Sequence, residues 1–274
     1  MNQDSFLKHT KKLLSRAKEV SKEKGIYYVI YGGIRRISNW SKNSFWLYYY
    51  KIFKSRTFIF EGQPLRSFYH KCNTTWKNER VVEIPIVWQI VKKDRGKKIL
   101  EVGNVLSHYF RVDHDILDKY EKANGIINQD VAYFQSNSKY DLIVSVSTLE
   151  HVGWDEEKWV IHEHRQQTTR SAAKIICAID NLKRLLSPEG KIVVTLPLGY
   201  NFELDRLLQN GEIKFTRMHC LKRISMDNKW IEVDWTDVQN SQYNSPFPAA
   251  NGLVIGIIEK DTTENAQNRA TKHY

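Results

Sequence analysis

Short apolar runs, each about as long as a β-strand, recur through the second half of the chain. Residues 155–186 instead carry apolar side chains at helical spacing, and residues 187–190 (Ser-Pro-Glu-Gly) predict a turn. Near-continuous apolar runs are typical of strands that are covered on both faces. We therefore predict an α/β fold with a mostly parallel sheet. The predicted strands are residues 97–104, 114–121, 125–131, 140–153, 191–201, 218–225 and 252–260.

The chain before residue 97 has a different pattern. Residues 5–24 carry apolar side chains at roughly helical spacing among lysines, which predicts a helix. A second, buried helix is predicted to begin at Asn78-Glu79-Arg80 and to contain Pro85 in its interior or first turn. The predicted organisation is a basic aromatic helical extension (1–60), a helical cap that contributes to substrate binding (61–96), a main domain (97–260) and a disordered polar tail (261–274).

Positive charge is concentrated at one end of this chain of 274 residues. The formal net charge is +11, yet residues 1–60 contain 13 lysines and arginines against 3 acidic residues. The remainder, residues 61–274, is therefore nearly neutral. Because the basic character belongs to one segment, the composition argues against nucleic acid as the main partner.

The end of the basic segment interleaves aromatic residues with cations, as in Trp46, Tyr48 and Lys51. Such a segment suits contact with an anionic membrane, where the rings lie at headgroup level. The same rings are also large core-forming groups, which slightly favours the other interpretation, a lid that packs on the main domain. The sequence leaves both interpretations open.

The sequence predicts a protein of a reducing compartment. No apolar run approaches the ~20 residues of a membrane-spanning helix, and the first residues lack the apolar core of a signal peptide. Cys72, Cys177 and Cys220 are odd in number and far apart, which argues against disulfides and against a thiolate zinc site. We expect a cytoplasmic protein without a metal site, peripheral to a membrane if the first segment is an anchor.

Polar residues stand where the predicted strands end. In open α/β sheets, ligands bind beyond the carboxyl ends of the strands, so these residues are the candidates for a site. They are Glu101, Gly103 and Asn104 after the first strand, Asp118 in the second, Asp130 in the third, and Glu150 and His151 in the fourth.

The motifs ILEVGN, NQDV, YDLIVSVSTLEHV and LKRLLSPEGKIVVTLP follow one another between residues 97 and 200. Together they resemble class I S-adenosylmethionine-dependent methyltransferases of the small-molecule type. The resemblance implies a Rossmann-like sheet of seven strands whose last strand, residues 252–260, is antiparallel and inserted. It also implies an enzyme whose cofactor is S-adenosylmethionine.

The resemblance assigns cofactor contacts to the strand ends. Asp118 would accept hydrogen bonds from both ribose hydroxyls, which suits a carboxylate, and Asp130 with the backbone N–H of Val131 would read the adenine edge. Gly103 would let the backbone approach the cofactor because it lacks a Cβ. The other residues of the implied cofactor site are Glu101, which would organise the first loop, Asn104 and Ser147.

The loop after the first predicted strand departs from the family pattern E-x-G-x-G-x-G. Residues 101–109 contain only one of the three glycines of this pattern, Gly103. Asn104 tolerates a positive φ and could still allow a turn. The side chains of Val105 and Leu106 would narrow the space for a cofactor. The connection to the second strand is short, so the first helix is curtailed. A domain that has lost catalysis and acts as a binding or scaffold module is therefore a second interpretation, and a nucleic-acid-binding protein is a third.

His151 is the candidate catalytic residue, because a neutral imidazole at the end of the fourth strand could take the proton of a hydroxyl acceptor. The same position also suits a structural residue. No D/N-P-P-Y/F motif and no Pro-Cys pair follows this strand, which argues against nucleic-acid methylation. We expect the acceptor pocket in residues 61–90, Trp154 and residues 198–250. The segment NTTWKNERVVEIP resembles proteins of surface-polysaccharide gene clusters, which implies O-methylation of a glycan or another small molecule.

Overall fold

The computed structural model describes residues 15, 21, 42–155 and 164–259. The chain divides into two compact units, Met1–Lys54 and Ser55–Tyr274, so the division falls before the predicted boundary at residue 60. In the first unit, residues 42–53 form a helix. Most of the predicted helix 5–24 and the whole predicted tail 261–274 lie outside the described residues. No helix in the described part of the chain is long and apolar enough to cross a membrane.

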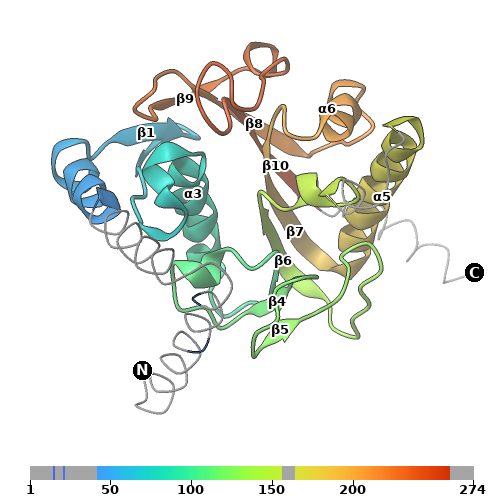
Figure 1. Cartoon of the computed structure of the whole chain (residues 1–274). Coiled ribbons are helices and arrows are strands. Elements are labelled where there is room, and N and C mark those ends of the chain that lie inside the picture. Colours follow the sequence, from blue (N-terminus) through green and yellow to red (C-terminus); the bar gives the residue numbers. More distant parts are fainter. Residues whose placement is uncertain (1–14, 16–20, 22–41, 156–163, 260–274) are drawn as a thin grey trace, which may run out of the picture. The chain divides into compact units, whose positions relative to one another are not determined.

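The second unit is built on one large sheet (Figure 1). Its strands are β3 (Ile99–Val102), β4 (Asp115–Leu117), β5 (Ile126–Ile127), β6 (Tyr140–Val146), β7 (Leu186–Pro197), β8 (Arg217–Arg223), β9 (Trp230–Val233) and β10 (Gly252–Glu259). The strand order is β5-β4-β3-β6-β7-β10-β8-β9. All pairs from β5 to β7 are parallel, and β10 is antiparallel to both of its neighbours.

This strand order confirms the predicted fold class. The last strand is antiparallel and inserted, with Ile255 of β10 opposite Thr195 of β7 on one side and His219 of β8 on the other. The sheet is Rossmann-like and mostly parallel, as the resemblance implies. It has one strand more than the resemblance implies, because β9 pairs antiparallel with β8 at the edge of the sheet.

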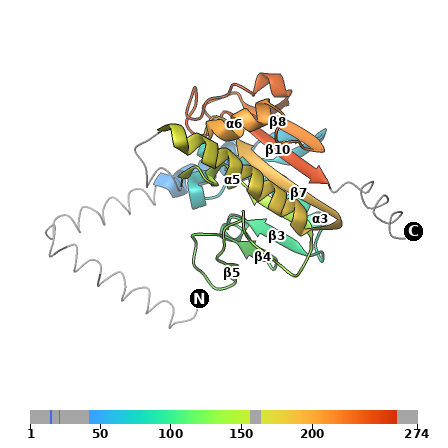
Figure 2. The ribbon, with the colours of Figure 1, turned by 90° about the vertical axis from the view of Figure 1, so that its right-hand side faces the viewer.

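Helices cover both faces of the sheet (Figures 1 and 2). The helix α3 (Arg80–Lys93) lies on one face, and α5 (His164–Leu185) and α6 (Phe202–Gln209) lie on the other. The predicted buried helix is α3, and Pro85 lies inside it. The sequence analysis does not predict α6, although Asn201 caps it by accepting hydrogen bonds from two backbone N–H groups of its first turn.

Two connections differ from the sequence prediction. The predicted turn at residues 187–190 lies inside β7, because Tyr140 pairs with Leu186 while Leu142 pairs with Lys191, and the residues between them bulge from the ladder. The predicted third strand is limited to β5. Between β3 and β4 the chain forms a single short 3-10 turn, η2 (Leu106–His108), in place of a first helix.

The segment before α3 is less helical than predicted. It contains the hairpin of β1 (Thr57–Phe60) and β2 (Gln63–Arg66) and the 3-10 segment η1 (Cys72–Lys77). Phe58 and Phe60 of β1 are buried in the second unit. Residues 55–60 therefore belong to the main unit rather than to the basic extension.

Candidate functional site

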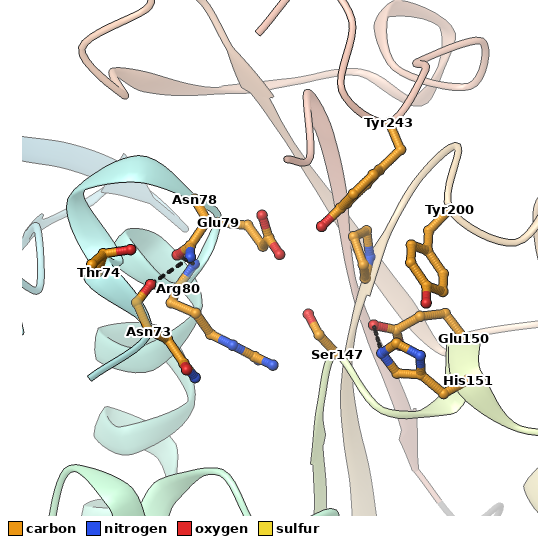
Figure 3. A pocket seen from close by; sticks show the side chains of 11 residues that line it. Asn73, Thr74, Asn78, Glu79, Arg80, Ser147, Glu150, His151, Tyr200 and Tyr243 are labelled. Atoms are coloured by element: carbon orange, nitrogen blue, oxygen red, sulfur yellow. Dashed lines mark hydrogen bonds and ion pairs between the residues drawn. The ribbon is translucent and has the colours of Figure 1, made fainter. Parts of the chain in front are cut away.

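Two cavities lie at the carboxyl ends of the parallel strands, where ligands of such sheets bind. Cavity A has a volume of about 280 Å³, and cavity B has a volume of about 320 Å³. Cavity A is lined by Gly103, Asn104, Val105, Asp118, Lys119, Asp130, Val131, Thr148, His151 and neighbouring residues. Cavity B, shown in Figure 3, is lined by Asn73, Thr74, Asn78, Glu79, Arg80, Ser147, Glu150, His151, Pro197, Tyr200 and Tyr243.

Glu101 holds the loop between β3 and η2. Its Oε1 accepts hydrogen bonds from the backbone N–H groups of Val105 at 2.9 Å and Leu106 at 2.6 Å. Its Oε2 lies 2.8 Å from Nε2 of His114. The side chain is fully buried and does not line cavity A, so Glu101 acts on the loop and not on a ligand.

Gly103 makes the turn that opens cavity A. Its φ is +83°, and a Cβ at this position would lie 2.2 Å from Oγ1 of Thr148. The turn therefore uses the glycine itself, and Asn104, which could tolerate a positive φ, does not have one. Asn104 lines the cavity, and its backbone N–H donates to Oδ2 of Asp118 at 3.0 Å.

Asp118 follows β4 directly and lines cavity A. Burial opposes its charge, but hydrogen bonds from the backbone N–H groups of Glu121, Asn104 and Tyr120 outweigh burial and lower its pKa. A carboxylate offers about four lone-pair sites, so these three donors leave room for one more. Asp118 can accept one ribose hydroxyl, whereas the sequence analysis assigns it both.

Asp130 also lines cavity A, but its carboxylate is paired. Burial opposes its charge, and the ammonium groups of Lys174 at 2.8 Å and Lys119 at 2.9 Å lower its pKa. The neighbouring Val131 offers a free donor instead. It is buried, and its backbone N–H makes no hydrogen bond with any described residue.

A network of buried polar groups underlies cavity B. Oε1 of Glu83 accepts hydrogen bonds from the hydroxyls of Ser147 at 2.5 Å and Thr195 at 2.6 Å, and Oε2 pairs with Arg80 at 3.1 Å. Arg80 also donates to the carbonyl of Val146 at 3.1 Å. Burial opposes the charge of Arg80, but Glu83 and the nearby acids outweigh it and raise its pKa.

Ser147 does not share a cavity with the other residues predicted to contact the cofactor. It lines cavity B and not cavity A, and its hydroxyl is committed to Glu83. The physical reason is the sharp turn after β6, where Ser147 has a φ of +40° and donates its N–H back to Thr195 of β7 at 3.1 Å.

Two further carboxyl groups line cavity B (Figure 3). Burial raises the pKa of Glu150 well above its ordinary value, and repulsion from Glu83 adds to the effect. Burial and Glu83 also raise the pKa of Glu79, whose Oε2 accepts the backbone N–H of Ala250 at 3.2 Å. Oε2 of Glu150 has no hydrogen-bond partner among the described residues.

His151 lines both cavities. Its Nδ1 lies 2.5 Å from Oδ2 of Asp155, and its Nε2 lies 3.6 Å from Oε1 of Glu150. The hydroxyl of Tyr200 donates to the carboxylate of Asp155 at 3.2 Å, and the Tyr200 ring packs against the imidazole with centroids 4.8 Å apart. Burial and Asp155 raise the pKa of Tyr200 to about 12, so this phenol remains a donor.

Three residues that line cavity B have a strained backbone. Asn73, Thr74 and Ser147 line it with φ values of 54°, 45° and 40°. A positive φ is uncommon outside glycine and is an outlier for a β-branched residue such as threonine. Strain of this kind persists where the surrounding structure enforces it, and it clusters at functional sites.

The structure brings most of the predicted site residues together. Gly103, Asn104, Asp118, Asp130, Val131 and His151 line cavity A, while Glu101 lies behind it and Ser147 lies in cavity B. Cavity B takes residues from both predicted acceptor segments, but Trp154 does not line it. Sequence reasoning missed the roles of Arg80, Glu83 and Asp155. No cluster of potential metal ligands occurs within the described ranges.

No protein-family model and no curated protein matches the sequence. Among solved structures, this chain is similar to the N-methyltransferase NodS from Bradyrhizobium japonicum in complex with S-adenosyl-L-homocysteine, at 12% identity over 66% of this chain and 87% of that chain, with a TM-score of 0.38. It is also similar to the sugar N-methyltransferase KedS8 from Streptoalloteichus sp., at 12% identity over 66% of this chain and 88% of that chain, with a TM-score of 0.31. Likenesses this distant establish no activity for this chain.

Proposed function

We propose that this protein is an S-adenosylmethionine-dependent methyltransferase that O-methylates a glycan or another small molecule. The observation that carries the proposal is the position of His151, which lines both cavities. A group transfer needs two substrates that meet at one point, and the two cavities meet at an imidazole. In this proposal cavity A holds the methyl donor and cavity B holds the acceptor.

The residues of cavity A suit the donor. The unbonded N–H of the buried Val131 is free to read an adenine edge, and Asp118 retains capacity for one ribose hydroxyl. Gly103 keeps the backbone open on the side of β3. When bound, S-adenosylmethionine supplies a methyl group on a positively charged sulfur, which is open to attack by a nucleophile.

His151 is the proposed general base. In this proposal Nδ1–H donates a hydrogen bond to the carboxylate of Asp155, so Nε2 keeps its lone pair and can take a proton from an acceptor hydroxyl. As the oxygen–methyl bond forms, the carbon–sulfur bond breaks and the hydroxyl proton passes to Nε2. The remaining contribution of the protein is alignment of the two substrates.

Titration calorimetry of the full chain with S-adenosylmethionine and with S-adenosylhomocysteine tests the proposal. Binding of both, weakened by substitution of Asp118, is the expected result. If neither binds, the proposal is wrong. A separate measurement tests the third interpretation, a nucleic-acid-binding protein. Such a protein would bind arbitrary DNA with an affinity that falls steeply as the salt concentration rises.

A binding or scaffold module without catalysis is the second candidate. It is favoured by the single glycine of the loop and by the volume of cavity A, about 280 Å³, which is just below the ~300–1,000 Å³ of small-molecule sites. Tight binding of the cofactor together with methyl transfer to an acceptor would exclude it. Tight binding without any transfer would support it.

We also propose that residues 1–60 contact an anionic membrane surface and make the protein a peripheral one on the cytoplasmic side. On the helix 42–53, Phe45, Tyr48 and Phe53 are exposed. Lys51 stands between Tyr48 and Phe53 in the sequence, and Lys42 and Lys54 flank the three rings. Exposed rings beside cations are suited to the headgroup region of anionic lipids.

A further inference from the structure

Glu150 has a free oxygen in a buried place. The residue is 1% exposed, lines cavity B, and its Oε2 has no hydrogen-bond partner in the described part of the chain. An unpaired buried polar group costs about 1–3 kcal/mol, so a group of this kind in a cavity wall indicates a ligand that pairs with it. Figure 3 shows the carboxyl group beside His151 and facing the side of the cavity formed by Arg80.

The surrounding charges favour a neutral Glu150. The cation of the cavity, Arg80, is already paired with Glu83 at 3.1 Å, and Glu83 is further satisfied by two hydroxyls. Burial raises the pKa of Glu150 well above its ordinary value. A neutral carboxyl group offers one donor and one acceptor, which matches a hydroxyl group, since a hydroxyl also does both.

The other walls of cavity B suit a hydroxylated ring. Tyr200 and Tyr243 pack edge to face, with centroids 5.2 Å apart and planes at 79°, and present aromatic surface. Asn73 and Asn78 line the opposite side with amide groups (Figure 3). Aromatic surface packs against the C–H groups of a ring, while amides and carboxyls pair with its hydroxyls.

We propose that cavity B binds a neutral, hydroxyl-rich ring of the pyranose type, and that Glu150 is its specificity-determining residue, donating a hydrogen bond to the hydroxyl next to the one that faces His151. Oε1 of Glu150 lies 3.6 Å from Nε2 of His151, so adjacent hydroxyls of one ring reach both groups. The proposal rests on the proposed function and names its acceptor class.

The alternative ligand is a cationic amine held by an ionised Glu150. Burial disfavours it, because it raises the pKa of the Glu150 carboxyl, and an ammonium group needs an ionised partner. The two ligands also differ in what they require of residue 150. If Glu150 acts as a neutral carboxyl group, the amide of a glutamine can replace it, because both groups donate and accept hydrogen bonds. If Glu150 binds an ammonium group, the negative charge of its carboxylate is required.

The test is ligand-observed NMR on the full chain saturated with S-adenosylhomocysteine. The probes are the methyl α-glycosides of glucose, mannose, galactose and rhamnose, with glucosamine as the matched cation. We expect at least one neutral glycoside to bind to the wild type, Glu150→Gln to retain its affinity within about twofold, and Glu150→Ala to weaken it by about twofold to tenfold. Thermal unfolding of both variants shows whether each is folded.

Two results would overturn the inference. One is binding of glucosamine in preference to every neutral glycoside, with loss of binding in Glu150→Gln. The other is the absence of binding by all neutral glycosides to a protein that does bind S-adenosylhomocysteine, and in this case the proposed function survives without the acceptor class. If S-adenosylhomocysteine itself does not bind, the proposed function fails first, and this inference fails with it.

Discussion

Nδ1 of His151 lies 2.5 Å from Oδ2 of Asp155, four residues later in the chain. The carboxylate is held from its other side by the hydroxyl of Tyr200. This arrangement fixes the imidazole in one orientation before any substrate binds, with Nε2 directed toward Oε1 of Glu150 at 3.6 Å. The His151–Asp155 pair therefore has the geometry of an oriented base at the junction of two cavities.

Substitution of His151 by alanine should lower turnover much more than it lowers cofactor affinity. General base catalysis contributes about 10²–10⁴ in rate, whereas the proposed ribose and adenine contacts come from Asp118 and Val131. The measurement compares kcat on the acceptor with the dissociation constant of S-adenosylhomocysteine.

Asp155→Asn is the matched variant, because it keeps the shape of the pair and removes the charge that holds the Nδ1 proton. It should fall between wild type and His151→Ala in kcat. Full turnover in His151→Ala would make His151 a structural residue and leave alignment as the whole of catalysis.

Asp118→Ala should weaken the binding of S-adenosylmethionine by about 1.5–3 kcal/mol, the range for hydrogen bonds to a charged group. The variant loses the ribose acceptor and also the anchor of the Asn104 backbone in the loop. Calorimetry measures the effect, and Asp180→Ala, an aspartate on α5 with a 59% exposed side chain, is the control. Equal affinity in wild type and Asp118→Ala would remove Asp118 from the cofactor site.

Gly103→Ala should destabilise the protein more than Gly125→Ala does. Both glycines have a strongly positive φ, +83° and +86°, so both variants carry the backbone strain of about 1–2 kcal/mol. A Cβ at Gly125 meets nothing within 4 Å, whereas at Gly103 it meets Oγ1 of Thr148 at 2.2 Å. Urea unfolding should show an extra loss of about 1–3 kcal/mol for Gly103→Ala. Equal losses would mean that the loop adjusts freely.

Asp205 should make stability depend on pH. Burial raises its pKa from 3.8 to about 6, so the folded state holds this proton more tightly than the unfolded state. The free energy of unfolding therefore contains a contribution that is full below pH 3.8, declines as the pH rises, and is lost above about pH 6. Asp205→Asn should gain stability relative to wild type across this window, by about 1–3 kcal/mol.

Urea unfolding of wild type and Asp205→Asn at several pH values measures this difference. The exposed Asp113 supplies the control variant, Asp113→Asn, whose difference from wild type should stay flat. A flat difference for Asp205→Asn as well would contradict the raised pKa.

The parallel part of the sheet could be predicted from the sequence because β4 and β6 are largely apolar runs that a polar residue follows directly. Asp118 follows β4 directly in this way. The edge strand β9 was harder to predict, since it is short and only partly buried. The helix α6 is also short, but Leu204, Leu207 and Leu208 stand at helical spacing after the capping Asn201, so a signal for this helix was present in the sequence. The place of Ser147 in cavity B could not be predicted, because its direction depends on the sharp turn after β6, and no residue pattern reveals that turn.

Cavity B could be predicted in its segments but not in its chemistry. Glu83 stands between Val82 and Ile84 in an apolar helix, and a buried acid in such a place needs a partner. This signal was available, but the partners Ser147 and Thr195 lie 64 and 112 residues away in the chain. Only the fold brings them together.

The N-terminal segment can be tested by two truncations. A chain that begins at Ser55 keeps the β1–β2 hairpin, whereas one that begins at Gly62 removes Phe58 and Phe60, which are 5% and 6% exposed. We expect the Ser55 chain to be soluble and folded, and the Gly62 chain to lose stability, because two buried aromatic side chains are absent.

With vesicles of anionic lipid, the full chain should bind and should detach as salt is raised, because the attraction is electrostatic and screened. The Ser55 chain should not bind. Co-sedimentation with anionic and with neutral vesicles measures both effects. If the Ser55 chain aggregates although it retains the hairpin, the first segment is a lid that covers apolar surface and not a membrane anchor, because an anchor can be removed without exposing a core.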